Sequence, residues 1–461
     1  MRKIKITLED LFELPTAVIY NPDDYKAVSG VSIDSRNIKK NDLFIAIKGD
    51  KFDGHKFVAD AVKNGAAAVM INKNRLRTLK NTEIPIIAVS DTTKAFGNLA
   101  NIYRRKLDVK VISITGSNGK TSTKEILETL LSEKYKVSKT ISNNNNHIGV
   151  PLTIFNTKPD CEILILEHGT NHFGEIKYTA EIAQPDYAVI TNIGDSHLEF
   201  LIDKNGVLKE KKDLLDIANN NGGKVLINCD DPMLKGLSKL YEDSITFGFK
   251  GNVETKGKLA GYTKEAFPKT VIKIGKTEIE TTIPLLGKAN AENYLTAVTI
   301  AVKLGLTEKQ IIEGTKKLVA FDRRLELTKV NSFYVINDSY NSNPASVKNG
   351  IDVLKKFKLA KRKILIFGDM FELGSGSKEK HITLCEPIIM AKIDNVLTIG
   401  TYSKYLSKQL KADGINARHF AKRENLIKYL LKSDLSESVI LVKGSRGMKM
   451  EEFVKVLEER N

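Results

Sequence analysis

Apolar residues in this chain gather in short runs that are separated by longer amphipathic stretches. Up to residue 90 the runs are brief, and one helix-like stretch at 57–64 stands between them. Asp91 is the predicted cap of a helix that extends to about Lys106. From Lys110 onward, runs such as 162–167 and 187–193 alternate with stretches of helical periodicity, and a second series of this kind begins after Phe321, with one helix predicted at 378–392. Strands that alternate with helices are typical of βαβ units and mostly parallel sheets.

One segment breaks this alternation. Residues 251–284 contain the alternating patterns TVIKI and EIETTI, which predict an antiparallel annex. The chain has 461 residues, and at about 150 residues per domain this length suggests three domains. We therefore predict an α/β fold with a small N-terminal domain at 1–90, a central parallel-sheet domain at 91–319 and a C-terminal Rossmann-like domain at 320–461.

The composition is that of an ordinary globular protein, with 41% hydrophobic and 28% charged residues. Its charge is less ordinary, because 72 Lys and Arg against 56 Asp and Glu give +16, which favours an anionic partner. These basic residues are scattered, with no arginine-rich arm, zinc finger or aromatic RNA-binding stripe. A basic nucleic-acid-binding protein is therefore the weaker alternative, and we expect no nucleic-acid partner.

The cysteines indicate a reducing compartment. Cys161, Cys229 and Cys385 lie far apart and form no CxxC pair, which argues against a disulfide scaffold or a zinc ribbon. Residues 1–15 lack the apolar core of a signal peptide. The longest apolar runs fall far short of the roughly 20 residues that a membrane helix needs. We expect a cytoplasmic protein with no membrane insertion.

The strongest local motif is TGSNGKTS at 115–122, which follows an apolar run and precedes a helical stretch. Glycines let backbone N–H groups face a phosphate at a helix N-terminus. Lys120 is expected to reach the β- and γ-phosphates and Thr121 to bind Mg²⁺. The more usual spacing would place glycine at position 114, where this chain has Ile114. The alternative interpretation is a glycine-rich turn between a strand and a helix, in which the lysine does not bind phosphate. The predicted ATP-binding residues of this loop are Gly116, Ser117, Asn118, Gly119, Lys120, Thr121 and Ser122.

Two further side chains follow predicted strands. Glu167 ends the run 162–167, and His197 follows the run 187–193. Because ligands of open parallel sheets bind beyond the carboxyl ends of the strands, we expect Thr121, Glu167 and His197 to share one crevice. Thr121 and Glu167 carry oxygen atoms and suit Mg²⁺, whereas histidine is a less usual ligand of this ion. Taken alone, His197 would be a hydrogen-bonded loop histidine.

These motifs resemble a known family. TGSNGKTS, then EHGTNHFGEI at 167–176, then NIGDSHLEF at 192–200 are similar to the ATP-dependent Mur ligases of peptidoglycan synthesis. The resemblance spans the chain, since six further segments fit in the family's order. These are DSR at 34–36, DGH at 53–55, NNNNHIGVPLT at 143–153, NDSYNSNPAS at 337–346, GDMFELG at 368–374 and KGSRGMKME at 443–451.

The resemblance implies a modified lysine. In the family, a lysine downstream of the metal histidine is carbamylated by CO₂ and helps to bind a second Mg²⁺. GVLKEKKDL at 206–214 matches that segment and favours Lys211, with Lys209 as the alternative. The family's usual Gly-Glu is Lys212-Asp213 here. The implied catalytic residues are Lys120, Glu167, His197 and Lys211, and the implied metal ligands are Thr121, Glu167, His197 and Lys211.

The resemblance also implies nucleotide and substrate contacts. Asn293 corresponds to the adenine contact, Arg324 to a phosphate contact and Asp338 to a ribose contact. Departures are Ala289 and Arg323, where the family commonly has histidine and glycine. The implied substrate-binding residues are Ser35, Arg36, Asp53 and His55 for the uridine diphosphate, Asn145 and Asn146 for the peptide, Asn341 and Asn343 for the dipeptide, and Ser445 and Arg446. Without the resemblance, these residues would be interpreted as parts of helix caps and surface turns rather than as binding residues.

The last-domain motifs are most similar to the dipeptide-adding members of the family. They imply ATP-dependent joining of D-alanyl-D-alanine to UDP-N-acetylmuramoyl-tripeptide through an acyl phosphate, with ATP, two Mg²⁺ ions and a carbamylated lysine. We expect a monomer. Rival interpretations are a folylpolyglutamate synthase, a ligase that adds a single amino acid, and a scaffold that only binds nucleotide. The third residue of the peptide is left open.

Overall fold

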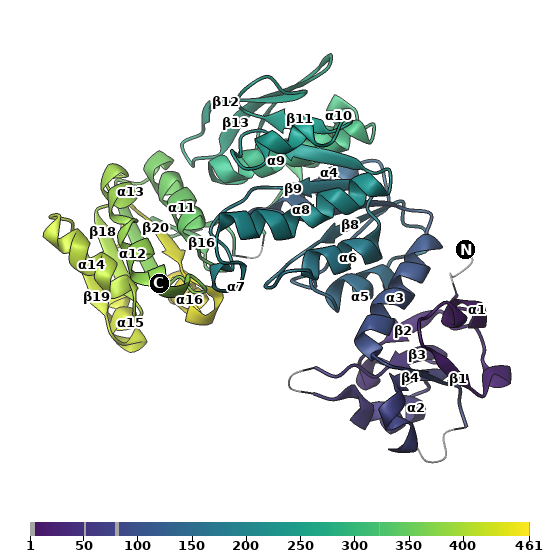
Figure 1. Cartoon of the computed structure of the whole chain (residues 1–461). Coiled ribbons are helices and arrows are strands. Elements are labelled where there is room, and N and C mark those ends of the chain that lie inside the picture. The colour runs from purple at the N-terminus through teal and green to yellow at the C-terminus, as the bar shows by residue number, and fades with distance from the viewer. Residues whose placement is uncertain (1–4, 50–51, 79–82, 322, 461) are drawn as a thin grey trace.

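A computed structural model describes residues 5–49, 52–78, 83–321 and 323–460 of the chain. Three separate β-sheets follow one another along the sequence. The domain with the first sheet and the domain with the third lie at opposite ends of the molecule, with the central domain between them (Figure 1). Three α/β domains were predicted, and this is the observed architecture. Residues 1–4 of the segment considered as a leader lie outside the described residues.

The N-terminal sheet has the order β1-β5-β4-β3-β2. The strands β2 to β5 are parallel to one another, and β1 is antiparallel to β5. Its elements are α1 (Leu8–Phe12), β1 (Val18–Tyr20), β2 (Gly30–Ser32), β3 (Asp42–Ile45), α2 (Val58–Lys63), β4 (Ala68–Asn72) and β5 (Ile86–Val89). The helix α3 (Thr92–Arg105) then leads into the central domain, and Asp91 caps its first turn as the sequence predicts.

The central sheet has the order β14-β13-β12-β11-β10-β9-β6-β8-β7. It is parallel from β7 to β12, while β12, β13 and β14 are antiparallel, which confirms the predicted annex. Its strands are β6 (Lys110–Thr115), β7 (Val137–Lys139), β8 (Ile163–Glu167), β9 (Tyr187–Ile190), β10 (Lys224–Asn228), β11 (Ile245–Gly248), β12 (Thr255–Tyr262), β13 (Pro268–Ile274) and β14 (Thr277–Thr282). Its helices after α3 are α4 (Lys120–Leu131), α5 (Gly149–Phe155), α6 (Glu175–Ala183), α7 (Leu198–Leu201), α8 (Lys204–Asn220), α9 (Gly287–Lys303) and α10 (Glu308–Lys316).

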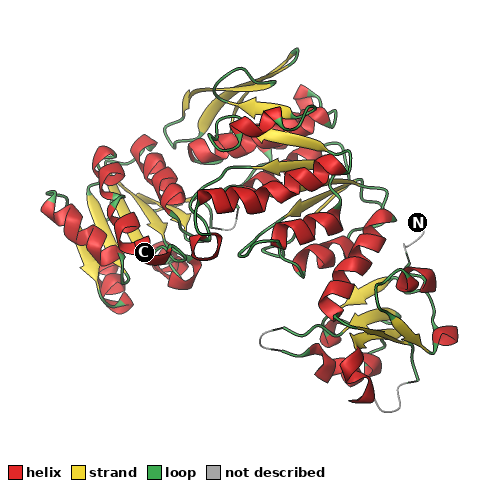
Figure 2. Cartoon of the chain, viewed as in Figure 1, coloured by secondary structure: helices red, strands yellow, loops and turns green. Residues whose placement is uncertain are grey.

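Helices cover both faces of this sheet (Figure 2). The strand β6 shows how the sequence directs this, because alternate side chains of a strand point to opposite faces. Ile112 and Ile114 pack with residues of α4 and α9, whereas Val111 packs with residues of α3 and α5. From Val111 to Ile114 the strand is thus buried on both sides, including the polar Ser113.

The C-terminal sheet has the order β15-β16-β20-β17-β18-β19. It is parallel except for β15, which is antiparallel to β16. Its strands are β15 (Glu326–Val330), β16 (Phe333–Asp338), β17 (Arg362–Gly368), β18 (Asn395–Ile399), β19 (Ala417–Phe420) and β20 (Ser438–Lys443). Its helices are α11 (Pro344–Lys356), α12 (Ser377–Ile382), α13 (Cys385–Met390), α14 (Ser403–Ala412), α15 (Arg423–Lys432) and α16 (Glu451–Glu458).

The structure differs from the predicted elements in two ways. The stretch 378–392, predicted as one helix, forms the two short helices α12 and α13. The strands β1, β7, β15 and β19 were not predicted, and each lies at an edge of its sheet, where a strand needs few apolar residues. No helix in the described part of the chain is both long enough and apolar enough to cross a bilayer.

Candidate active site

The phosphate loop connects β6 to α4 and turns on two glycines with positive φ. Gly116 has φ +149° and Gly119 has φ +82°. A Cβ on Gly116 would lie 1.9 Å from Thr191 Oγ1, and one on Gly119 would lie 2.2 Å from Asn293 Oδ1. Both conformation and space therefore require glycine at these positions. Lys120 lies across the loop and donates from Nζ to the carbonyl of Gly116 at 2.6 Å.

The sheet order brings the predicted metal residues together. The strands β8, β6 and β9 are neighbours, so Glu167, the phosphate loop and the loop that ends at His197 all lie at one edge of the sheet. Glu167 is 2% exposed. Its Oε1 accepts hydrogen bonds from Thr121 Oγ1 at 3.2 Å and from Asn145 Nδ2 at 2.9 Å. The phosphate loop, the end of β8 and the predicted peptide-binding loop thus meet at one carboxylate.

The donors at this point fit a magnesium ion. Glu167 Oε2 is buried and has no hydrogen-bond partner, and the Lys124 ammonium lies 3.6 Å from it. Carboxylate and hydroxyl oxygens are ligands that Mg²⁺ prefers. No group of three or more His, Cys, Asp or Glu side chains that could hold a metal occurs among the described residues. A magnesium ion here would complete its shell with nucleotide oxygens and water, as Mg²⁺ commonly does.

His197 connects the central domain to the C-terminal domain. It has φ +53° at the start of α7, and its Nδ1 lies 3.1 Å from Oε2 of Glu372. The hydrogen bond from His197 lowers the pKa of Glu372, while burial acts in the opposite direction. The imidazole therefore has a partner in the other domain at the edge of the site.

Lys211 is buried on α8, with 1% of its side chain surface exposed. Burial, and to a lesser extent the nearby ammonium of Lys120, lowers its pKa well below the ordinary value. Lys209, the alternative, is exposed, and its Nζ lies 5.7 Å from the ring centroid of Phe173. Of the two lysines, only Lys211 combines burial with proximity to the phosphate loop.

The predicted adenine contact lies directly against the loop. Asn293 is buried on α9, and its Oδ1 accepts a hydrogen bond from Thr123 Oγ1 at 3.3 Å. Its Nδ2 donates to Asn290 Oδ1 at 3.4 Å. Because Gly119 approaches the same amide, the start of α9 and the phosphate loop form one continuous surface.

The C-terminal domain adds polar groups from the opposite side. Arg324 donates from Nη2 to Thr121 Oγ1 at 3.1 Å, and its guanidinium carbon lies 3.9 Å from the ring centroid of Tyr340. Asn343 donates from Nδ2 to Asn118 Oδ1 at 2.7 Å. Both contacts cross from one domain to the other at residues of the phosphate loop.

The predicted ribose contact, Asp338, is held in a buried ion pair. Lys443 is 1% exposed and donates from Nζ to Asp338 Oδ2 at 2.6 Å and to the carbonyl of Asn341 at 3.0 Å. Burial raises the pKa of Asp338, whereas the Lys443 ammonium opposes this rise. One carboxylate oxygen is therefore already engaged.

These groups surround a cavity of about 570 Å³ between the central and C-terminal domains. Most predicted site residues line it. They are Ser117, Asn118, Gly119, Lys120, Thr121, Ser122, Asn145, Glu167, His197, Asn293, Arg324, Asp338, Asn341, Asn343 and Arg446. The phosphate loop, the metal residues and the last-domain residues thus form a single site.

Other predicted residues lie outside the cavity lining and have structural contacts. Asn146 Oδ1 accepts from the N–H groups of Ile148 and Gly149 at the start of α5. Ser445 is 3% exposed, and its hydroxyl accepts from the N–H of Phe371 at 2.8 Å. Gly116 shapes the loop through its backbone, and Lys211 lies beneath the cavity surface.

The first-domain residues do not converge on one cavity. Arg36 is exposed and donates to both carboxylate oxygens of Asp34 at 2.9 and 2.8 Å, which lowers the pKa of Asp34 to about 2. His55 accepts from the N–H of Asn72 at Nε2, so its Nδ1 donates to Asp53 at 2.7 Å. Arg36, Asp53 and His55, all predicted to contact the uridine diphosphate, thus have partners within the first domain. Ser35, the fourth predicted contact, is buried.

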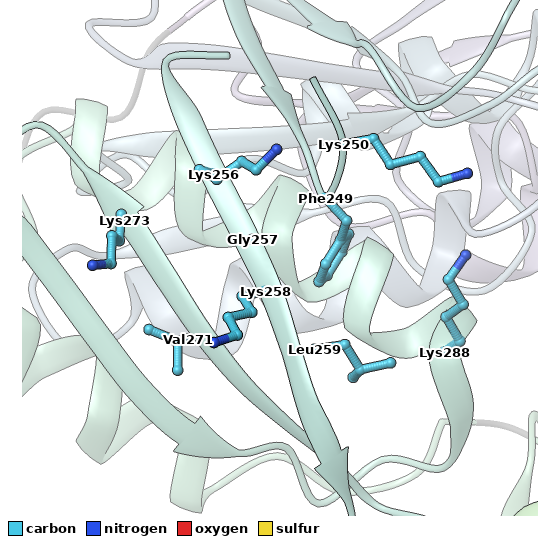
Figure 3. A pocket seen from close by; sticks show the side chains of 9 residues that line it. All are labelled: Phe249, Lys250, Lys256, Gly257, Lys258, Leu259, Val271, Lys273 and Lys288. Carbon is cyan, nitrogen blue, oxygen red and sulfur yellow. The ribbon is translucent and has the colours of Figure 1, made fainter. Parts of the chain in front are cut away.

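A separate cavity of about 460 Å³ lies on the antiparallel annex (Figure 3). Five lysines surround its apolar floor, namely Lys250, Lys256, Lys258, Lys273 and Lys288. Two of them are paired with acids, Lys273 with Glu278 and Lys288 with Glu292, each at 2.8 Å. No predicted site residue lines this cavity. Part of the positive charge of the chain therefore gathers away from the phosphate loop.

Sequence reasoning missed several residues of the site. Tyr340 and Asn192 line the cavity, and Glu372 contacts His197. Tyr340 and Glu372 lie within the motifs 337–346 and 368–374, so motif position could have suggested them. Asn192, whose carbonyl and side chain accept from the N–H groups of Ser117 and Asn118, begins the motif 192–200, so motif position could have suggested it as well.

The fold and the site are those of an ATP-dependent ligase with three domains, and the chain belongs to the Mur ligase family. Residues 27–104 match the Mur ligase family catalytic domain, 114–301 the Mur ligase middle domain and 323–446 the Mur ligase glutamate ligase domain. The UDP-N-acetylmuramoyl-tripeptide–D-alanyl-D-alanine ligase of Bacillus subtilis (strain 168) is 34% identical over 99% of both chains. The ligase of the same name from Escherichia coli (strain K12) is 31% identical, also over 99% of both.

Solved structures agree with this assignment. A crystal structure of MurF from Acinetobacter baumannii matches with a TM-score of 0.88 and 25% identity, covering 100% of both chains. The MurF ligase from Thermotoga maritima in complex with ADP matches with a TM-score of 0.82 and 26% identity, covering 93% of this chain and 97% of that one.

Proposed function

We propose that this chain is an ATP-dependent ligase that joins D-alanyl-D-alanine to UDP-N-acetylmuramoyl-tripeptide and releases ADP and phosphate. The observation that carries the proposal is the single cavity in which the phosphate loop and Glu167 face Arg324 and Asn343 of the C-terminal domain. Similarity along the whole chain to the curated dipeptide-adding ligases supports this pair of substrates.

The reaction requires positioning rather than a protein nucleophile. An oxygen of the tripeptide's terminal carboxylate attacks the γ-phosphorus of ATP, and the bond to ADP breaks, which leaves an acyl phosphate. The amine of D-alanyl-D-alanine then attacks the acyl carbon and loses a proton, and the C–O bond to phosphate breaks. Lys120 and Arg324 would neutralise phosphate charge during these steps, with Lys120 exchanging the Gly116 carbonyl for the nucleotide.

Thr121 and Glu167 are the side chains that would hold Mg²⁺, with His197 as a further contact. When bound, the metal would supply positive charge between the nucleotide and the carboxylate. The 3.2 Å hydrogen bond between the Thr121 hydroxyl and Glu167 Oε1, both oxygen donors of the kind that Mg²⁺ prefers, supports this assignment.

Carbamylation of Lys211 is part of the proposal. A neutral amine attacks CO₂ and loses one proton to solvent, which gives a carbamate on Nζ whose single negative charge is shared by two oxygens. Burial and the lowered pKa of Lys211 favour the neutral amine that this step needs. The exposed Lys209 has neither feature, so we assign the modification to Lys211.

The remaining assignments concern the substrates. Asn145 would contact the peptide and Asn341 and Asn343 the dipeptide, with Arg446 as a further contact from the last domain, because all four line the cavity. Ser35, Arg36, Asp53 and His55 would bind the uridine diphosphate from the first domain, and Arg36 would exchange Asp34 for phosphate oxygens. Since ATP and UDP-linked precursors are cytoplasmic, we place the reaction in the cytoplasm, and we retain the monomer as our expectation.

Phosphate release tests the proposal. ATP and Mg²⁺ are supplied with the UDP-linked tripeptide and D-alanyl-D-alanine, separately and together. We expect release only with both, and we expect Lys120→Ala to abolish it while the affinity for the UDP-substrate stays near that of the wild type. Release with a single amino acid or a folate in place of these substrates would favour the rival ligases.

A further inference from the structure

A second lysine of α4 is buried one helical turn after Lys120. Lys124 is 1% exposed, and its Nζ donates to the carbonyl of Thr140 at 2.7 Å. The same ammonium lies 3.2 Å from Glu125 Oε1 and 3.6 Å from Glu167 Oε2. Because residues four apart share one helix face, Lys120 and Lys124 point toward the same end of the sheet.

Lys124 lies beside the carboxylate of Glu167, which also accepts a hydrogen bond from Thr121 of the phosphate loop. Glu167 Oε1 faces Thr121 and Asn145, while its buried Oε2 has no hydrogen bond and is paired with the Lys124 ammonium. The N–H of Glu167 in turn donates to Thr140 Oγ1 at 3.0 Å. A buried carboxylate is unfavourable without a counter-charge, and Lys124 supplies that charge from the side away from Thr121.

Lys124 also connects two elements that bind different substrates. Thr140 follows β7 and precedes the loop that carries Asn145. By bonding the carbonyl of Thr140, Lys124 fixes the start of this loop to the phosphate-loop helix. The phosphate loop, the Glu167 carboxylate and the peptide loop are therefore held by one ammonium.

We propose that Lys124 is a positioning residue of the ligase reaction. It holds the Glu167 carboxylate oriented so that Oε1 faces Thr121 and Asn145, and it aligns the Asn145 loop with the phosphate loop. This inference rests on the proposed function, in which Glu167 binds the divalent cation.

The experiment compares Lys124→Met with Lys139→Met. Lys139 is a matched control, because it pairs with the same Glu125 and with Glu128 on α4, the latter at 3.2 Å, and Glu167 is not among its partners. Mn²⁺ serves as the probe, and its binding in the presence of ADP is measured by electron paramagnetic resonance. We expect Lys124→Met to weaken Mn²⁺ binding roughly 10- to 100-fold. Lys139→Met should bind Mn²⁺ as the wild type does.

The comparison separates positioning from stability. Loss of thermal stability in both variants with unchanged Mn²⁺ affinity of the folded protein would overturn the proposal, as would tighter binding in Lys124→Met. If Lys124→Met does not fold, Lys124→Gln is measured instead, because its side-chain amide can still donate to the carbonyl of Thr140 while the charge that faces Glu167 is lost. Failure of the proposed function would appear separately, as wild-type phosphate release that does not need both substrates.

Discussion

Nδ1 of His197 in the central domain lies 3.1 Å from Oε2 of Glu372 in the C-terminal domain. Two more contacts cross between these domains at the site, one from Arg324 to Thr121 and one from Asn343 to Asn118. All three involve a predicted ATP-binding or metal-binding residue on the central domain. The position of the C-terminal domain and the arrangement of the site are therefore coupled, as closure of a catalytic site requires.

Removing the charge of Glu372 should weaken this coupling. We expect Glu372→Gln to lower turnover roughly two- to fivefold, the effect of losing one partly exposed contact between the two domains. The affinity for the UDP-linked tripeptide should not change, because Glu372 lies on the C-terminal domain. Steady-state kinetics measure both. The control is Glu379→Gln, an exposed acid of α12 in the same domain. Equal, wild-type turnover in both variants would show that the contact has no role.

The phosphate loop should not tolerate a side chain at Gly119. Both Gly119→Ala and Gly222→Ala place alanine at positive φ, +82° and +75°, which costs about 1–2 kcal/mol of stability each. Only at Gly119 does the new Cβ meet another atom, Asn293 Oδ1 at 2.2 Å, whereas Gly222 has no atom within 4 Å. We expect Gly119→Ala to weaken ADP binding and to lower turnover on the order of 100-fold. Calorimetry that finds equal ADP affinity in the two variants would contradict the described loop.

Lys211 should differ sharply from its neighbour Lys209. We expect Lys211→Ala to lower turnover roughly 10- to 100-fold, because the carbamate proposed at this position can no longer form. Lys209→Ala should stay near the wild type, since that side chain is exposed. Depleting CO₂ should lower wild-type turnover and bicarbonate should restore it. Wild-type turnover that does not respond to CO₂ would refute the carbamate while leaving the ligase assignment intact.

Stability should fall in mild acid because of His168. This side chain is fully buried between Thr179 Oγ1 at 2.9 Å and Ser113 Oγ at 2.8 Å, and burial lowers its pKa from 6.5 to about 3. Below pH 6.5 the unfolded chain binds a proton that the folded chain excludes, so the free energy of unfolding decreases as the pH falls from 6.5 toward 3. Between pH 7 and pH 5 this loss amounts to about 2 kcal/mol.

The variant His168→Gln removes this titration and keeps a donor and an acceptor for the two hydroxyls. Urea unfolding of both proteins at pH 7 and pH 5 measures the difference. We expect the variant to lose less stability between the two pH values than the wild type. An identical loss would assign the acid sensitivity to other groups.

The sequence predicted the elements whose pattern is local. The alternation in 251–284 became β12, β13 and β14, and the capping residue Asp91 marked the start of α3. Short edge strands such as β7, with three residues, carry too little pattern to be recognised, although they complete the sheet. The division of 378–392 into two helices was missed because Cys385 and its neighbours keep an apolar face throughout.

The site could be predicted where residues follow buried strands. Glu167 and the phosphate loop meet because β8 and β6 are neighbours in a parallel sheet. The alternation of strands and helices in the sequence predicts such a sheet. The contact from Glu372 to His197 depends instead on how two domains pack, and no local pattern contains that information. Likewise, nothing in the sequence separates Lys124 from the other lysines of amphipathic helices. Only its burial beside Glu167 in the structure distinguishes it.

Oxygen transfer from the peptide to phosphate is the most direct test of the account. UDP-N-acetylmuramoyl-tripeptide labelled with ¹⁸O in its terminal carboxylate is incubated with ATP, Mg²⁺ and D-alanyl-D-alanine, and the released phosphate is analysed by mass spectrometry. An acyl phosphate intermediate predicts that each phosphate released carries one carboxylate oxygen and therefore the label. Product formation with unlabelled phosphate would contradict the proposed reaction.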